Sequence, residues 1–170
     1  IKYAKALGRS IKLLASSRLV DGKYCALVAP FMLPVEHPLY PVSDVFNAVF
    51  VHGNVLGDAM FYGSGAGKLP TASAVVADIV DIAKHTGKHV WIDWEQEKLE
   101  LADYKDAEYR FFVRTGADRS AIEAAFGNVS YVDAVDGLKE VAFVTEQMSG
   151  KAYEAAAEKL GDIINMIRVN

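Results

Sequence analysis

The stretch Met60-Phe61-Tyr62-Gly63-Ser64-Gly65-Ala66-Gly67 runs into Lys68-Leu69-Pro70 and then into an apolar segment. Its pattern predicts a strand over 56–62, a glycine-rich turn and a helix over 70–85. Proline suits the first helical position, where its missing N–H costs nothing, and Gly87 ends the helix. The apolar residues of this helix fall on one face: Val75, Val76, Ile79, Ile82 and Ala83.

Upstream of this stretch the sequence predicts two strand pairs. Strands over 10–19 and 23–33 meet at Asp21-Gly22, a strong hairpin signal, and strands over 47–52 and 56–62 meet at Gly53-Asn54. The first eight residues, Ile1 to Gly8, are typical of the closing turns of a helix capped by glycine. We therefore expect this chain to be a piece of a longer protein.

Downstream, residues 91–104 carry alternating charges and a weak apolar pattern, which predicts a solvated connector with a possible short helix. Beyond it the element order predicts a split ferredoxin-like βαββαβ arrangement. The expected strands are 109–114, 128–135, 138–145 and 163–169, and the expected helices are 118–126 and 149–160. Asp118, or Ser120 with Glu123, is expected to cap the first helix, and Ser149 the second.

The middle hairpin of this arrangement is expected to turn at Asp136-Gly137. One face of the sheet should carry both helices, and a partner subunit or a second domain should cover the other. The fold class expected from the whole pattern is α+β.

Composition excludes several classes of function. The 170 residues are 52% hydrophobic and 24% charged with a net charge of −4, which gives no electrostatic reason to bind nucleic acid or an anionic membrane. The single cysteine, Cys25, excludes an intrachain disulfide and a cysteine metal cluster, and it favours a reducing, cytoplasmic location. Because Cys25 lies in an apolar run, we expect it in the core.

The glycine turn is the feature of the first half that suggests chemistry, because bare backbone before a helix can hold an anion or an amide. Its spacing differs from the dinucleotide fingerprint, which would need glycine where Lys68 stands. It also differs from a P-loop, because Leu69 follows the lysine and Tyr62 takes the first glycine position. Spacing alone therefore leaves two interpretations open, a tight strand-to-helix turn or a ligand contact.

The other candidate groups do not assemble a site. His85 and His89 have a metal-chelating spacing, but Gly87 interrupts the helix between them, so no metal site is expected. His37 and His52 are expected to be structural or solvated. The sequence contains no complete catalytic constellation.

The residues themselves resemble a known family. The segments Tyr3–Gly8, Ile11–Leu14, His37-Pro38-Leu39 and Phe46–Val51 are similar to the second half of bacterial homoserine dehydrogenases. The run from Met60 through Gly67 to Asp78 is the most specific match. By element order, the second half of the chain resembles the ACT-type regulatory domain that bacterial members carry.

The resemblance implies three parts: residues 1–94 as the end of the catalytic domain, 95–107 as a linker, and 108–170 as an ACT-type domain. It implies a parent enzyme that reduces L-aspartate 4-semialdehyde to L-homoserine with NADP or NAD as cofactor. The family's catalytic lysine, substrate-binding acids and nucleotide-binding domain precede this segment, so no catalytic residue is assigned here. Gly67, with Gly65 and Ala66 beside it, matches the family's cofactor-contacting position.

The resemblance also implies feedback inhibition by threonine. A dimer or higher oligomer is expected because the weakly alternating sheet faces would otherwise be exposed to water. The turn Thr115-Gly116-Ala117 departs from the Asp-x-Pro-Gly pattern common in ACT domains, so the effector stays open. Two alternative functions are a free-standing amino-acid sensor of the ACT type and a purely structural oligomerisation module.

Overall fold

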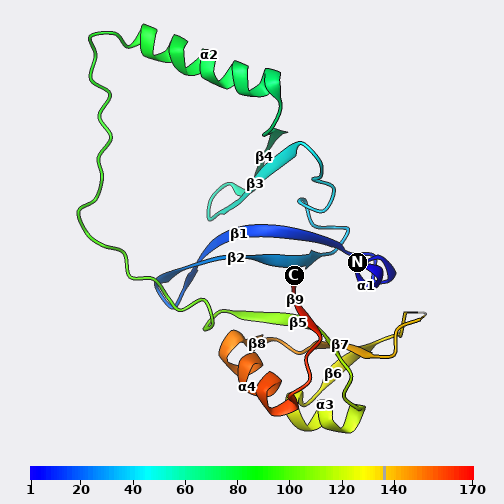
Figure 1. Ribbon diagram of the computed structural model, residues 1–170. Coiled ribbons are helices and arrows are strands. Elements are labelled where there is room, and N and C mark those ends of the chain that lie inside the picture. Colours follow the sequence, from blue (N-terminus) through cyan, green and yellow to red (C-terminus); the bar gives the residue numbers. More distant parts are fainter. Residues whose placement is uncertain (136) are drawn as a thin grey trace. The chain divides into compact units, whose positions relative to one another are not determined.

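The computed structural model describes residues 1–135 and 137–170 (Figure 1). Within them the chain forms helices together with parallel and antiparallel strands, which confirms the predicted α+β class. The chain divides into two compact units, residues 1–35 with 99–170 and residues 36–98.

The first unit is built on one mixed sheet. Its strands are β1 (Ser10–Val20), β2 (Lys23–Leu33), β5 (Glu108–Thr115), β6 (Val129–Val132), β7 (Val141–Thr145), β8 (Met148–Ser149) and β9 (Asn165–Val169). Its helices are α1 (Lys2–Ala6), α3 (Arg119–Phe126) and α4 (Gly150–Leu160). The strand order is β1-β2-β9-β5-β7-β6, with β8 paired to β5. The pair β2–β9 is parallel and the others are antiparallel.

The last third of the chain has the predicted ferredoxin-like order. Four strands run β9-β5-β7-β6, and α3 and α4 pack on one face of them (Figure 1). The core between helices and sheet contains Phe111, Val113, Ile122, Phe126, Phe143, Tyr153 and Ala156. Burial in this core raises the pKa of the Tyr153 phenol to about 12.

The opposite face of this sheet is partly covered by the chain itself. Tyr3 and Ala4 of α1 pack with Met32, Phe112 and Val169 in a second buried cluster. Sequence analysis expected a partner subunit or a second domain on this face. Part of the cover comes from α1, which lies in the residues 1–94 that were expected to form the other domain, and a partner subunit on this face stays a prediction.

The predicted three-part division differs from the observed grouping. The strand pair β2–β9 joins residues near position 30 to the chain's end, through the partners Phe31–Arg168 and Met32–Val169. Because this pairing extends the sheet, residues 1–35 fall into one compact unit with 99–170. The assignment of residues 1–94, 95–107 and 108–170 to separate functional parts stays a prediction.

The predicted β1–β2 turn, the two predicted helix caps and the predicted burial of the cysteine are confirmed. Asp21 and Gly22 both have positive φ (48° and 77°), which suits the tight turn between β1 and β2. Asp118 accepts a hydrogen bond from the Ala121 N–H and caps α3, and Ser149 caps α4. Cys25 is buried, as predicted. The predicted turn residue Asp136 lies outside the described residues.

The second unit contains the antiparallel pair β3 (Phe46–Gly53) and β4 (Gly57–Ser64), followed by α2 (Lys68–Lys84). The hairpin was predicted to turn at Gly53-Asn54, but the strands close at Gly53 and Gly57, so the loop is longer. A positive φ of 76° at Gly57 explains why glycine stands there. The described part of the connector 91–104 contains no helix.

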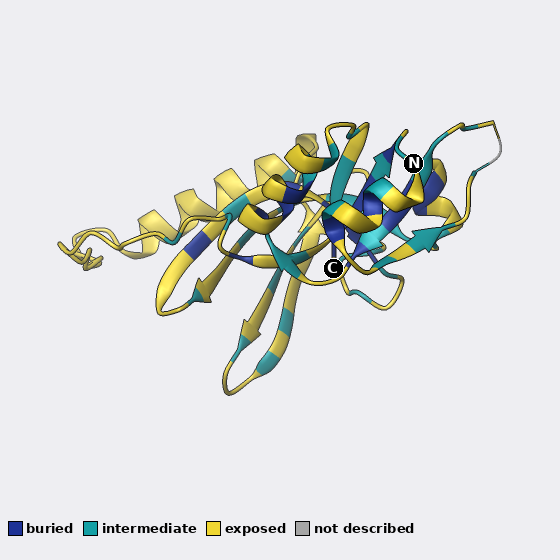
Figure 2. Ribbon diagram, turned by 90° about the horizontal axis from the view of Figure 1, so that it is seen from below, coloured by how far each residue is buried: buried dark blue, intermediate teal, exposed yellow. Residues whose placement is uncertain are grey.

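Burial differs sharply between the elements (Figure 2). The helix α2 buries no residue, although its face is apolar. Among the described residues, no helix combines the length and apolar character needed to cross a lipid bilayer.

A charged pair lies at the edge of the second cluster. The Arg114 guanidinium donates to both Glu140 carboxylate oxygens over 2.8 and 2.7 Å, and the Glu140 side chain is only 6% exposed. These bonds hold the pKa of Glu140 below its ordinary value. Burial, and then the Glu140 charge, raise the pKa of the Tyr3 phenol beside them.

We predict that Glu140→Gln destabilises the chain by roughly 1–3 kcal/mol near neutral pH, because it weakens a charge-assisted pair. Since the folded-state pKa of Glu140 is depressed, its contribution exists above the ordinary glutamate pKa and is lost as pH falls through the folded value. The difference between wild type and variant should therefore shrink below about pH 4. Urea unfolding at a series of pH values measures this difference in the free energy of unfolding. The exposed Glu158→Gln is the matched control, and an equal loss at every pH would contradict the assignment.

Candidate functional site

The predicted cofactor-contacting residues Gly65, Ala66 and Gly67 form the turn between β4 and α2. All three are exposed. The Gly65 N–H donates to the Val45 carbonyl over 3.1 Å, and the Gly67 carbonyl accepts from the Thr71 N–H at 3.1 Å. The turn is therefore held by backbone bonds on both sides while its outer surface stays open.

Glycine is required in this turn for two different reasons. At Gly67 the backbone has φ 123°, a region that residues with a side chain rarely adopt. At Gly65 an added Cβ would lie 2.1 Å from Nδ2 and 2.8 Å from Cγ of Asn47. Spacing in the sequence did not reveal this second reason, because Asn47 lies on the neighbouring strand.

A hollow of about 300 Å³ lies over the hairpin beside this turn. It is lined by both strands, from Asn47 to Val49 and from Phe61 to Gly65. The stacked rings of Phe46 and Tyr62, with centroids 5.0 Å apart, pack at the same end of the hairpin. The bare turn therefore borders an open, partly apolar surface.

The start of α2 suits a negatively charged or amide-bearing group. Gly67 is the N-cap and supplies no side-chain bond to the first free N–H groups of the helix. The first turn contains no acidic residue and begins with Lys68. The Lys68 charge lies beside the positive end of the helix dipole, which is unfavourable. An anion bound there would be attracted by the lysine and by the dipole.

The histidines have structural partners. His37 Nδ1 accepts from the Leu39 N–H at 3.1 Å, and burial lowers the pKa of His37. His52 pairs with Asp58 across the hairpin at 2.5 Å, and His85 Nδ1 lies 2.9 Å from the Asp81 carbonyl. Among the described residues, no group of three or more histidine, cysteine or acidic side chains could hold a metal ion.

The turn after β5, where the ACT resemblance would place an effector, is closed by the chain itself. The Gly116 N–H donates to Asp162 Oδ2 over 2.9 Å, and the Thr115 hydroxyl donates to the Asp162 carbonyl. A Cβ at Gly116 would lie 2.7 Å from that carboxylate oxygen. Sequence reasoning missed Asp162, because it lies almost fifty positions away from the turn.

Comparison with known proteins gives a consistent result. The family model described as homoserine dehydrogenase matches residues 1–80. Homoserine dehydrogenase of Bacillus subtilis is 44% identical over 85 residues, which is 50% of this chain and 20% of that protein. The Synechocystis enzyme is 33% identical over 187 residues, covering 96% of this chain and 43% of its own length.

Solved structures extend the likeness to the whole chain. A homoserine dehydrogenase from Thiobacillus denitrificans matches with a TM-score of 0.81 and 25% identity, over 100% of this chain and 44% of that one. The S. aureus enzyme at pH 6.0 matches with a TM-score of 0.70 and 27% identity over the same shares. The chain thus spans less than half the length of these relatives.

All of these matches are to homoserine dehydrogenases, and none of those proteins is covered over more than half of its length. More particularly, residues 1–80 belong to the homoserine dehydrogenase family, and the whole chain has the fold of a fragment of solved members. The family resemblance drawn from the glycine turn is confirmed.

We predict that Gly65→Ala disturbs the turn, because the new methyl group must displace the Asn47 side chain. The expected cost is about 1–3 kcal/mol of local stability, seen as faster hydrogen exchange of the amide of residue 65. Gly63→Ala is the matched control, since a Cβ there meets open space. The double variant with Asn47→Ala should recover most of the protection, and failure to recover would show that steric conflict is not the cause.

Proposed function

We propose that this chain is the C-terminal part of an enzyme that interconverts L-aspartate 4-semialdehyde and L-homoserine with NADP or NAD. The proposal rests on the match of residues 1–80 and on the whole-chain likeness to solved homoserine dehydrogenases. The bound cofactor would supply the hydride that reduces the aldehyde carbon, and a proton would be delivered to the carbonyl oxygen; the reverse reaction returns both. In the proposed parent, the nucleotide-binding domain and the catalytic lysine lie before Ile1.

The exposed glycine turn is the observation that carries the proposal. Gly65, Ala66 and Gly67 present backbone without bulky side chains beside an open hollow. A flat ring or an amide can approach such a surface closely, and the free N–H groups at the start of α2 can donate to it. These residues would therefore position the cofactor, and the lack of bulky side chains would leave room for it at the turn.

We also propose a regulatory role of the ACT type for residues 108–170, which residues 95–107 would link to the first part of the chain. The proposed location of the enzyme is the cytoplasm. Threonine is the first effector to test. An effector at the turn after β5 must displace the Asp162 carboxylate, because that group already accepts from the Gly116 N–H. Threonine binding at this turn would therefore require the Asp162 side chain to move.

Self-association is the further part of the proposal. Five apolar side chains on α2 are between 45% and 70% exposed: Val75, Val76, Ile79, Val80 and Ile82. Leaving a contiguous apolar face of this size in water is unfavourable. We assign a second copy of the chain as its cover.

We predict that Gly67→Val in the full-length parent enzyme raises the KM for the nicotinamide cofactor by about tenfold or more, which corresponds to ~1.4 kcal/mol. The valine both obstructs the turn and strains a backbone with φ 123°. Steady-state kinetics with NADP and with NAD measure the effect. Gly53→Val, at the far end of the hairpin, is the matched control, since a Cβ there makes only ordinary contacts of 3.7 Å or more.

The same experiment has a second control in the 170-residue chain, which should show no turnover with homoserine and either cofactor. Hydride transfer needs the nicotinamide to be held by the nucleotide-binding domain. Unchanged kinetics of the Gly67→Val enzyme, or turnover by the 170-residue chain, would refute the role assigned to this turn.

We predict a dimer for the 170-residue chain in sedimentation velocity. Ile79→Glu should shift it towards monomer, because a charge buried in an apolar contact without a partner is costly. Lys84→Glu, in the last turn of α2, is the control and should leave the mass unchanged. A wild-type chain that sediments as a monomer at all concentrations would contradict the proposal.

A further inference from the structure

The hollow over the β3–β4 hairpin is lined by a polar side chain, Asn47, that stands next to the glycine turn. Asn47 on β3 is the partner of Gly63 on β4, and opposite residues of an antiparallel pair face the same side of the sheet. Gly63 has no side chain, and a Cβ added there would meet nothing within 4 Å among the described residues. The space beside the Asn47 carboxamide is therefore open.

The Asn47 carboxamide is held in place from two sides. Its Nδ2 donates to the Val45 carbonyl at 3.5 Å, and the same carbonyl accepts from the Gly65 N–H. It also lies so close to the Gly65 backbone that a Cβ on Gly65 would overlap with the amide group. The amide therefore belongs to the glycine turn in space, although it comes from the neighbouring strand.

The oxygen of this amide has no donor within the chain. An asparagine side chain offers one acceptor oxygen and two N–H donors, and one N–H of Asn47 is used on Val45. Among the residues that the structure describes, none donates to Asn47 Oδ1. Because the side chain is exposed, this oxygen and the second N–H are available to a bound molecule.

An apolar wall lies next to the amide. Val49 and Phe61 are strand partners two residues along from Asn47 and Gly63, so they face the same side of the hairpin. Both line the hollow, and they are 62% and 70% exposed. The hollow of about 300 Å³ is at the lower end of ligand pockets, which suits a single ring rather than a whole dinucleotide.

We propose that Asn47 recognises the carboxamide of the nicotinamide ring, with its Oδ1 accepting from the carboxamide NH2. This inference rests on the proposed function and adds to it a residue that determines which ring is bound. The nicotinamide brings an aromatic face for the wall of Val49 and Phe61 and an N–H donor for the unused oxygen. Asn47 thus has two roles, since it also supports the turn through Val45.

The test compares the oxidised nicotinamide cofactor with its 3-acetylpyridine analogue, in which a methyl group replaces the carboxamide NH2. Isothermal titration of the full-length parent enzyme gives the Kd of each ligand without any need for turnover. We expect the wild type to bind the analogue about fivefold more weakly, because one hydrogen bond is lost and an acceptor is left unpaired. In Asn47→Ala the two Kd values should differ by less than about twofold.

Two further variants separate recognition of the ring from support of the turn. Asn47→Asp retains an acceptor oxygen and should keep the preference for the nicotinamide, although it loses the N–H that donates to Val45. Asn54→Ala, exposed at the far end of the same hairpin, is the matched control and should leave both Kd values unchanged. If Asn47 only supports the turn, Asn47→Ala weakens both ligands by the same factor, and the unchanged preference contradicts the proposal.

The wild type alone keeps the test decisive if an Asn47 variant does not fold. Equal Kd values for the two ligands in the wild type would overturn the role of Asn47. A failure of the proposed function looks different, because the full-length enzyme would then bind neither ligand and would not oxidise homoserine. If the enzyme oxidises homoserine and Gly67→Val weakens cofactor binding, while the preference survives Asn47→Ala, only the role of Asn47 is refuted.

Discussion

The parallel pairing of β2 with β9 is the contact on which the rest of the first unit depends. Phe31 and Met32 lie beside Arg168 and Val169, and the Asn170 N–H donates to the Met32 carbonyl. This short ladder extends a four-stranded ferredoxin-like sheet with a long hairpin from the start of the chain. It also brings α1 over the open face of that sheet, where Tyr3 packs tilted against Phe112 with ring centroids 5.4 Å apart.

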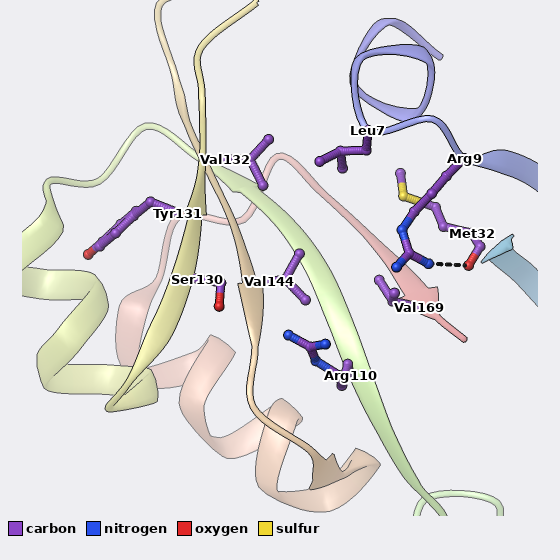
Figure 3. Close-up of a pocket in the computed structure, with 9 residues that line it drawn as sticks. All are labelled: Leu7, Arg9, Met32, Arg110, Ser130, Tyr131, Val132, Val144 and Val169. Carbon is purple, nitrogen blue, oxygen red and sulfur yellow. Dashed lines mark hydrogen bonds between the residues drawn. The ribbon is translucent and has the colours of Figure 1, made fainter. Parts of the chain in front are cut away.

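The same pairing creates the chemistry of that face. It brings Arg9 to the backbone oxygens of Met32 and Asn170, and the separate pairing of β5 with β9 aligns Arg110 with Val169. Where a carboxylate is available, as for Arg114 with Glu140, the guanidinium is neutralised inside the fold. Arg9 and Arg110 both line a hollow on the same face (Figure 3).

The second unit differs from the first in how little of its helix is buried. Its hairpin strands pair along their whole length, yet α2 buries none of its residues. Backbone bonding therefore determines the shape of the glycine turn, and side-chain packing contributes little to it. This arrangement suits a turn that is proposed to contact a cofactor, because an open backbone is accessible and a packed one is not.

Much of the secondary structure was readable from local signals. The Asp21-Gly22 turn, the caps at Asp118 and Ser149 and the βαββαβ order were predicted because each depends on a few neighbouring residues. Two features were not predicted: the longer hairpin loop before Gly57 and the absence of a helix in the described connector. In those segments the propensities are weak, and nothing nearby in sequence decides between alternatives.

By itself the sequence determined the elements, their order and the identity of the exposed turn, because hydrophobic period, turn residues and the run from Met60 to Gly67 are local properties. Tertiary structure alone decided which faces are covered and which charges meet. Three contacts join residues of different strands or loops: Asn47 with Gly65, Asp162 with Gly116, and Arg9 with the hollow that Arg110 also lines. Such contacts follow from strand register, which is set by the packing of the whole sheet and cannot be read from any one segment.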